Sequence, residues 1–234
     1  MDRQRQAEER AGTSMPVTPR ARFRAAIVAV GAAVLLGGFV YHPYISRPTD
    51  EAAIAAAAAS DTMRWGLAHL AIGVGYALVV LAFLAIRAYL RETGEDRWSA
   101  QAFPFIVLGS TLFAVLTGME FALLAAAETG GDVQAAQSAV MPWFIPIFVT
   151  GAISFALGAF GFARAIGHSE VLSPRLTRLV RVALVAMAVA RFVPLAPAPY
   201  VLAAAGAVAL WPLAYAMWRH PSAPAVQARS IPVI

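Results

Sequence analysis

The sequence contains no cysteine and no lysine, and it is poor in charge. Without cysteine the chain can form no disulfide, no thiolate metal site and no cysteine nucleophile. Charged residues make up 13% of its 234 residues, about half of the usual share in a soluble domain. This shortage of charge excludes an ordinary soluble domain and directs attention to where the apolar residues lie.

Hydrophobic residues make up 60% of the chain, and they gather in uncharged runs of roughly 20 residues. That is the length an α-helix needs to cross the hydrocarbon core of a bilayer. The runs are too long and too continuously apolar for barrel strands, so helices must satisfy the backbone inside the membrane. The sequence therefore predicts an all-α, polytopic membrane bundle of about six transmembrane helices. They are expected at residues 24–42, 63–90, 102–127, 140–166, 176–196 and 199–218.

The remaining segments are expected to lie outside the bilayer. Residues 1–22 are polar and arginine-rich, which is typical of a disordered cytoplasmic tail, and 220–234 is expected to form a second cytoplasmic tail. Residues 23–219 then form one six-helix domain. Within it the alanine-rich stretch 49–60 is too short to span and predicts an external helix, with Thr49 as its N-cap and Asp61 capping the next helix.

The positions of the arginines predict the orientation of the chain. Fifteen of the 18 basic residues, all of them arginine, fall in the two tails and in the connections 2–3 and 4–5, and three fall on the other side. Short cytoplasmic loops are enriched in arginine and lysine, so both termini are expected in the cytoplasm. Because the arginines lie at helix ends, the net charge of +5 does not indicate nucleic-acid binding.

The fourth predicted helix carries a face of small residues. Gly151, Ser154, Gly158, Gly161 and Ala165 recur at three- and four-residue spacing, which lets a neighbouring helix approach closely. The neighbour can belong to the same bundle or to a second protein, with Gly151, Gly158 and Gly161 as the contact. We expect packing within the bundle.

Three ionisable residues lie within the predicted spans on the side opposite the termini. Counted from that side, His69, Glu120 and Arg191 lie at roughly 9, 10 and 8 Å depth, at 1.5 Å per helical residue. Charged groups inside hydrocarbon cost at least ~2.5 kcal/mol on insertion scales and are functional candidates by default. The matching depths predict one polar cluster on three helices near the outer face.

Polar or small residues share one helical face with these three groups. The faces comprise Ser110, Phe113, Thr117 and Glu120; His69, Gly73 and Tyr76; and Trp143, Thr150 and Ser154, with His42 and Tyr44 as a lid above them. We expect these faces to turn inward, because lipid would reject them.

Two interpretations of the cluster remain open. In the first, Glu120 and Arg191 form a buried salt bridge that fixes helix register. In the second, an outward-facing polar pocket binds or transports a small or lipid-like ligand, with Arg191 holding an anionic group. The candidate ligand-binding residues are His69, Tyr76, Thr117, Glu120, Trp143 and Arg191. A structural or accessory subunit of a membrane assembly is the alternative function.

A metal- or haem-binding enzyme is the third hypothesis. His42, His69 and Glu120 would form a two-histidine, one-carboxylate set, with Met63, Met119 and Met141 on the same side. A haem-binding protein would pair His42 with His69 on the outer side and His168 with His220 on the inner side. No pair has i, i+4 spacing on one helix and no His-Glu-x-x-His motif occurs, so no cofactor is expected. Phosphate-cradling glycine loops, Gly-x-Ser-x-Gly elbows and nucleotide fingerprints are also absent.

Residues near helix ends indicate contacts with the bilayer. Trp65, Trp143, Trp218, Tyr41 and Tyr44 are expected to act as interfacial anchors. The basic inner rim is expected to meet anionic headgroups, although a role in topology alone would explain it; it comprises Arg87, Arg91, Arg175, Arg178 and Arg181.

The layout resembles a group of uncharacterised six-helix bacterial integral membrane proteins with a domain of unknown function. The similarity rests on a Gly/Ala-rich first helix, the alanine-rich segment from Asp50 to Ser60, and the sequence Arg64-Trp65-Gly66-Leu67-Ala68 that opens the second helix. It implies a multi-pass protein of the bacterial cytoplasmic (inner) membrane. The group has no established activity to carry over.

Overall fold

The computed structural model describes residues 19–219, and every regular element in this part of the chain is helical. The elements are α2 (Pro19–Tyr41), α3 (Glu51–Ser60), α4 (Thr62–Glu92), α5 (Arg97–Met119), α6 (Phe121–Glu128), α7 (Val133–Ser169), α8 (Pro174–Val189), the 3-10 turn η1 (Ala190–Phe192) and α9 (Ala198–Arg219). The predicted tails at 1–18 and 220–234 lie outside the described residues. Residues 19–22, predicted as tail, form the first turn of α2.

Aspartate side chains fix where three of the helices begin. Asp50 accepts two hydrogen bonds from backbone N–H groups in the first turn of α3, so Asp50 is the N-cap and not Thr49. Asp61 caps α4 in the same way, as predicted, and Asp132 caps α7. Each carboxylate satisfies N–H groups that a helix start leaves without an internal partner.

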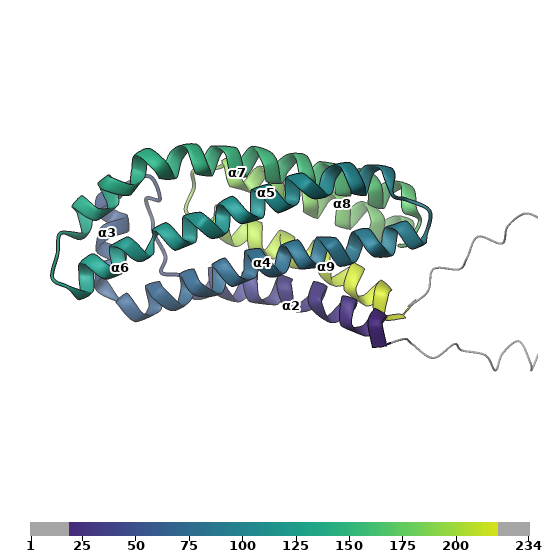
Figure 1. The fold of residues 1–234 in the computed structure, drawn as a ribbon, viewed down its shortest axis with the longest axis horizontal. Helices are drawn as coiled ribbons and strands as arrows, with labels where there is room; N and C mark the ends of the chain where they lie inside the picture. The colour runs from purple at the N-terminus through teal and green to yellow at the C-terminus, as the bar shows by residue number, and fades with distance from the viewer. Residues whose placement is uncertain (1–18, 220–234) are drawn as a thin grey trace, which may run out of the picture.

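Six helices form a closed ring in the order α2, α4, α5, α7, α8, α9, in which each packs against two neighbours. In Figure 1 their axes run along the length of the molecule. The start of α2, the end of α9 and the α4–α5 and α7–α8 turns all lie at one end of the bundle. The interior is filled by large apolar side chains, including Phe83, Phe155, Phe162, Leu184 and Leu210.

Among residues 19–219, five helices are long and apolar enough to cross a membrane: Pro19–Tyr41, Thr62–Glu92, Arg97–Glu128, Val133–Ser169 and Ala198–Arg219. The third of these comprises α5 and α6, which a turn at Glu120 separates. The sixth predicted span, 176–196, is shorter than expected. Its helix, α8, has 16 residues and ends at Val189. Large apolar side chains point outward around the ring, such as Leu84, Leu157 and Trp211, as in a surface that faces lipid.

Two helices extend well past a bilayer's thickness. The α4 and α7 helices have 31 and 37 residues, whereas about 20 suffice to span. α7 begins at Val133, before the predicted 140, because its polar first turns pack on other helices and not on lipid. Ser138 there donates a 2.6 Å hydrogen bond to Glu51 of α3. We call α3, α6 and the first turns of α4 and α7 the cap; it lies opposite the end where α2 starts.

The small-residue face of α7 is covered by α5 of the same chain. A Cβ atom added to Gly158 would lie 2.8 Å from the backbone nitrogen of Ile106, and one added to Gly161 would lie 2.5 Å from the Cβ of Ala102. At Gly151 it would lie 3.2 Å from Leu112. These glycines therefore serve packing inside the bundle.

Candidate functional site

Arg191 lies at the centre of a cage of aromatic rings. Its guanidinium carbon is 3.9 Å from the ring centroid of Phe113 and 4.1 Å from that of Phe155, and 5.2 Å from that of Tyr76. The side chain is 6% exposed. A guanidinium over an aromatic face is attracted by the ring quadrupole, so three helices, α4, α5 and α7, hold a cation that η1 supplies. We call these four residues the Arg191 cage.

The guanidinium uses only part of its hydrogen-bonding capacity. Nη1 donates to the hydroxyl of Tyr76 at 3.1 Å, while Nε and Nη2 are buried and have no partner in the part of the chain that the structure describes. These two nitrogens lie on one edge of the guanidinium, the edge that can donate two parallel hydrogen bonds to a carboxylate or phosphate. The neighbouring hydroxyl of Ser110, one turn from Phe113, is also buried without a partner.

No acid neutralises Arg191 within the described residues. The ion pairs among residues 19–219 are Arg24–Glu92, Arg47–Asp50 and Arg87–Asp96. The predicted alternative of a Glu120–Arg191 salt bridge is therefore not formed. Glu120 is itself buried, and its Oε2 has no hydrogen-bond partner.

A second layer of polar residues lies nearer the cap. His42, just after α2, contacts both Trp65 and His69 of α4, with ring centroids 5.2 and 4.9 Å apart. The Trp65 ring is also tilted against the His69 ring, with centroids 4.4 Å apart, and its indole nitrogen donates to the backbone oxygen of Glu120 at 3.2 Å. This bond satisfies a carbonyl at the turn between α5 and α6. We call His42, Trp65, His69 and Glu120 the histidine layer.

Both histidines of this layer are oriented by backbone carbonyls. Nδ1 of His42 lies 2.8 Å from the oxygen of Pro43, and Nδ1 of His69 lies 2.8 Å from that of Trp65. A carbonyl only accepts, so each Nδ1 carries the proton and each Nε2 remains an acceptor. Burial lowers the pKa of His42, the Pro43 carbonyl partly opposes this, and the Arg64 guanidinium lowers the pKa further.

The predicted common depth of the three ionisable groups is wrong for Arg191. Glu120 is level with Trp65, whereas Arg191 is level with Tyr76 and Phe113. Phe113 precedes Glu120 on its helix by about two turns, roughly 10 Å at 1.5 Å per residue. The reason is that α8 and η1 end before the cap, so their outer end is not level with the starts of α4 and α7.

The other candidate residues divide between the interior and the surface. Thr117 faces α4 at Gly73, where an added Cβ would lie 3.0 Å from its hydroxyl, and it donates to a carbonyl of its own helix. Trp143 is 70% exposed, and Thr150 is exposed too. Both were expected to turn inward with Ser154, but only Ser154 is buried. Thr150 is rotated by about 100° from Gly151 on the packed face, since a helix has 3.6 residues per turn.

Two aromatic residues of the site were not predicted. Phe155 has no polar character to mark it, although it lies on the packed face of α7. Trp65 was expected to be an interfacial anchor, but it is buried and holds the α5–α6 turn. A tryptophan four residues after a capping aspartate signals a helix start equally well in lipid or under a cap, so sequence alone could not separate the two.

The metal hypotheses find little geometric support. In residues 19–219 no group of three or more histidine, aspartate and glutamate side chains is placed to hold a metal ion. Met63 is exposed, and Nδ1 of His168 donates to the carbonyl oxygen of Arg164 at the opposite end of the bundle. His220 lies outside the described residues.

Comparison with known proteins found no family model that matches this chain, no similar curated protein and no similar solved structure.

Proposed function

We propose that this protein crosses the bacterial cytoplasmic membrane six times and binds or transports a small or lipid-like molecule whose anionic group is held by Arg191. The observation that carries the proposal is the buried guanidinium, which among residues 19–219 has two adjacent unpaired N–H groups and no carboxylate within 4.0 Å. Removing an ion from water costs several kcal/mol unless a partner compensates. Three aromatic rings and one hydroxyl compensate only in part, and an anionic ligand would supply the rest.

Six crossings follow if α8, η1 and the connection to α9 count as a span. The ring then alternates in direction, which agrees with both described chain ends lying at one end of the bundle. That end carries most of the arginines, which supports a cytoplasmic assignment. Arg181 and Arg191 are about ten residues apart, roughly 15 Å, so Arg191 would lie near the middle of a ~30 Å core.

The ligand would enter from the side of the cap. The connection 193–197 lies directly after Arg191, and Phe192, Val193 and Leu195 are exposed. Because α8 ends and α9 begins below the cap, this short connection would be the cover over the Arg191 cage on that side. The anionic head of such a ligand would accept hydrogen bonds from Nε and Nη2 of Arg191. Its apolar tail would lie beside the rings of Phe113 and Phe155.

The test uses dodecanoate and dodecyl phosphate as anionic probes and dodecyltrimethylammonium as the cationic control. Each is added to the purified protein in a neutral maltoside detergent, and thermal unfolding is followed. At about 100 times Kd a ligand stabilises by about 2.7 kcal/mol, which for this chain length corresponds to roughly 5–10 °C. We expect that shift with an anionic probe for the wild type and its loss in Arg191→Gln.

Arg47→Gln is the matched control, since it removes the same charge from an exposed residue paired only with Asp50. It should keep the full shift. Equal shifts in Arg191→Gln and Arg47→Gln, or an equal shift with the cationic probe, would contradict the proposal.

A further inference from the structure

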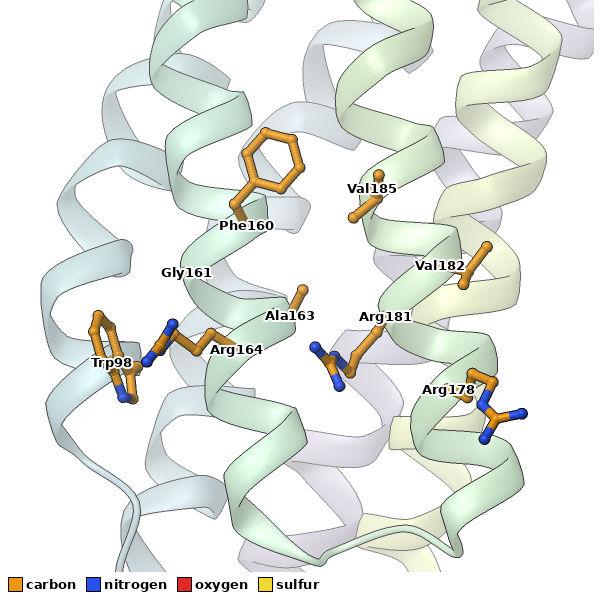
Figure 2. A pocket seen from close by; sticks show the side chains of 9 residues that line it. All are labelled: Trp98, Phe160, Gly161, Ala163, Arg164, Arg178, Arg181, Val182 and Val185. Carbon is orange, nitrogen blue, oxygen red and sulfur yellow. The ribbon is translucent and has the colours of Figure 1, made fainter.

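A groove between α7 and α8 opens at the end of the bundle opposite the cap. It encloses about 600 Å³, and Figure 2 shows it between the two helices just above the turn that joins them. It is separate from the Arg191 cage, none of whose residues lines it; Arg191 lies in η1, six residues after Val185. No part of the proposed function uses it.

The end of the groove nearest the turn is strongly basic. Arg164 from α7 and Arg178 and Arg181 from α8 line it, and the Arg181 side chain reaches into the gap between the helices in Figure 2. Within residues 19–219 none of the three lies within 4.0 Å of a carboxylate, because the ion pairs there involve other arginines. Three cations thus line this end of the groove without a counter-ion among the described residues, with Arg181 in the gap and Arg164 and Arg178 on either side of it.

Two of these arginines are each held by a contact with a neighbouring residue. The guanidinium of Arg164 lies over the indole of Trp98 of α5 at 4.1 Å. The Arg181 guanidinium lies against Gly167, where an added Cβ would come within 3.3 Å of its carbon. A residue that only determines topology needs charge at one end of a helix and no such placement. The placement therefore favours a ligand-binding role over a role in topology alone.

The other end of the groove is apolar and open to the surroundings of the bundle. Phe160 of α7 and Val182 and Val185 of α8 line it and are exposed. Along the helix axis the lining of the groove changes from basic near the turn to apolar farther from it. A phospholipid changes in the same order, from its charged headgroup to its acyl chain. A water-soluble anion would gain nothing from this apolar half.

We propose that the groove binds an anionic phospholipid of the leaflet on the side of the chain ends. Its phosphate would lie among Arg164, Arg178 and Arg181, and the first part of an acyl chain would lie against Phe160 and Val185. Arginine forks match phosphate oxygens in geometry as well as in charge, and basic pockets between membrane helices bind lipid headgroups. The volume of about 600 Å³ suits the glycerol phosphate and part of one chain.

The experiment measures lipid binding by native mass spectrometry of the purified full chain, with phosphatidylglycerol, phosphatidylcholine and inorganic phosphate as probes. We expect phosphatidylglycerol to bind with at least tenfold higher affinity than phosphatidylcholine, and phosphate alone not to compete at millimolar concentration. The variant R164Q/R178Q/R181Q should lose this preference, with phosphatidylglycerol affinity reduced roughly 10- to 100-fold, since each arginine near an anionic surface contributes about one tenfold step at most.

The matched control is R91Q/R97Q/R175Q, which removes the same number of exposed charges from the same end of the bundle but from outside the groove. It should keep the preference. An equal loss in both triple variants, no lipid preference in the wild type, or full competition by phosphate would overturn the proposal. If the groove variant does not fold, the single variant R181Q is compared with R175Q by the same criterion.

Discussion

At the scale of single residues, the guanidinium in the Arg191 cage makes favourable contacts but does not satisfy all of its hydrogen-bond donors. The aromatic faces of Phe113 and Phe155 and the hydroxyl of Tyr76 stabilise the cation, while Nε and Nη2 remain without acceptors. A charge-assisted hydrogen bond contributes about 1.5–3 kcal/mol, and a buried unpaired donor costs a similar amount. The Tyr76 hydroxyl is therefore the contact whose loss the cage would tolerate least.

Tyr76→Phe should lower the free energy of unfolding by about 1.5–3 kcal/mol, because a third guanidinium nitrogen then loses its partner. In the background of Arg191→Met the same change should cost less than about 0.5 kcal/mol, since no cation remains to be satisfied. Denaturation of the four proteins in detergent gives the coupling energy. Equal costs in the two backgrounds would show that the hydroxyl acts independently of Arg191.

His42 predicts a dependence of stability on pH. Burial lowers its pKa from 6.5 in the folded protein, so the unfolded chain binds the proton first as the pH falls. Stability is then fully present above about pH 6.5 and is lost as the pH falls from there toward the folded pKa. We expect the unfolding temperature to decline between pH 7 and pH 5, and His42→Gln to make that decline shallower. Superimposable pH profiles of the two proteins would refute this role.

Sequence reasoning could find most of the site's residues but not their partners. Helical periodicity and the cost of charge in hydrocarbon predicted that His69, Tyr76, Glu120 and Arg191 are buried, and they are. Periodicity says which residues of one helix share a face. It carries no information on the relative height of two helices, which is why the sequence predicts Arg191 level with Glu120 and leaves a salt bridge between them open.

At the scale of the elements, the contact between α5 and α7 depends on glycine at its closest points. A Cβ added to Gly109 would lie 2.6 Å from the backbone nitrogen of Phe155, and one added to Gly158 would lie 2.8 Å from that of Ile106. Backbone atoms cannot move aside as a flexible side chain can. This contact also positions Phe113 and Phe155 around Arg191, so the cage depends on it.

Gly109→Ala should therefore destabilise the protein by about 1–3 kcal/mol or more, the usual cost of overpacking. Gly37→Ala is the control, because nothing lies within 4 Å of its added Cβ. It should be neutral or stabilise by up to about 1 kcal/mol through helix propensity. Thermal unfolding in detergent ranks the two variants, and a Gly109→Ala protein as stable as Gly37→Ala would contradict the close approach.

The helices themselves were largely predictable, because long apolar runs leave few alternatives in a membrane. The ends were less so. The polar first turns of α7 pack on α3 and not on lipid, and hydropathy therefore missed them. α8 was expected to extend to 196 because its apolar character continues, but the prolines at 194 and 197 and the 3-10 turn at Ala190–Phe192 end it.

At the scale of the whole molecule, the ring, the cap and the groove define two different ends. The absence of cysteine makes the assignment of these ends to the two sides of the membrane directly measurable. Ser60 in the cap and Ser173 in the α7–α8 turn are both exposed, and each can be replaced by a single cysteine.

A membrane-impermeant maleimide should label Ser60→Cys in intact cells and Ser173→Cys only after the inner membrane is permeabilised. This result is expected because the arginine-rich end, which includes the α7–α8 turn, should face the cytoplasm. The cysteine-free wild type reports background labelling. Labelling of Ser173→Cys in intact cells would reverse the orientation, and labelling of both would contradict a fixed one.

The shortness of α8 has a consequence for how the chain enters the membrane. An arginine at the centre of a helix raises the free energy of insertion by about 2.5–3.5 kcal/mol, and α8 has only 16 residues, with three arginines in its first turns. It is therefore a poor substrate for the translocon on its own. Tyr76, Phe113 and Phe155 all precede Arg191 in the chain, so the rings that stabilise the cation are synthesised before it. The fifth segment would accordingly be inserted against a bundle that is already partly assembled, and the C-terminal third of the protein would not insert as an independent unit.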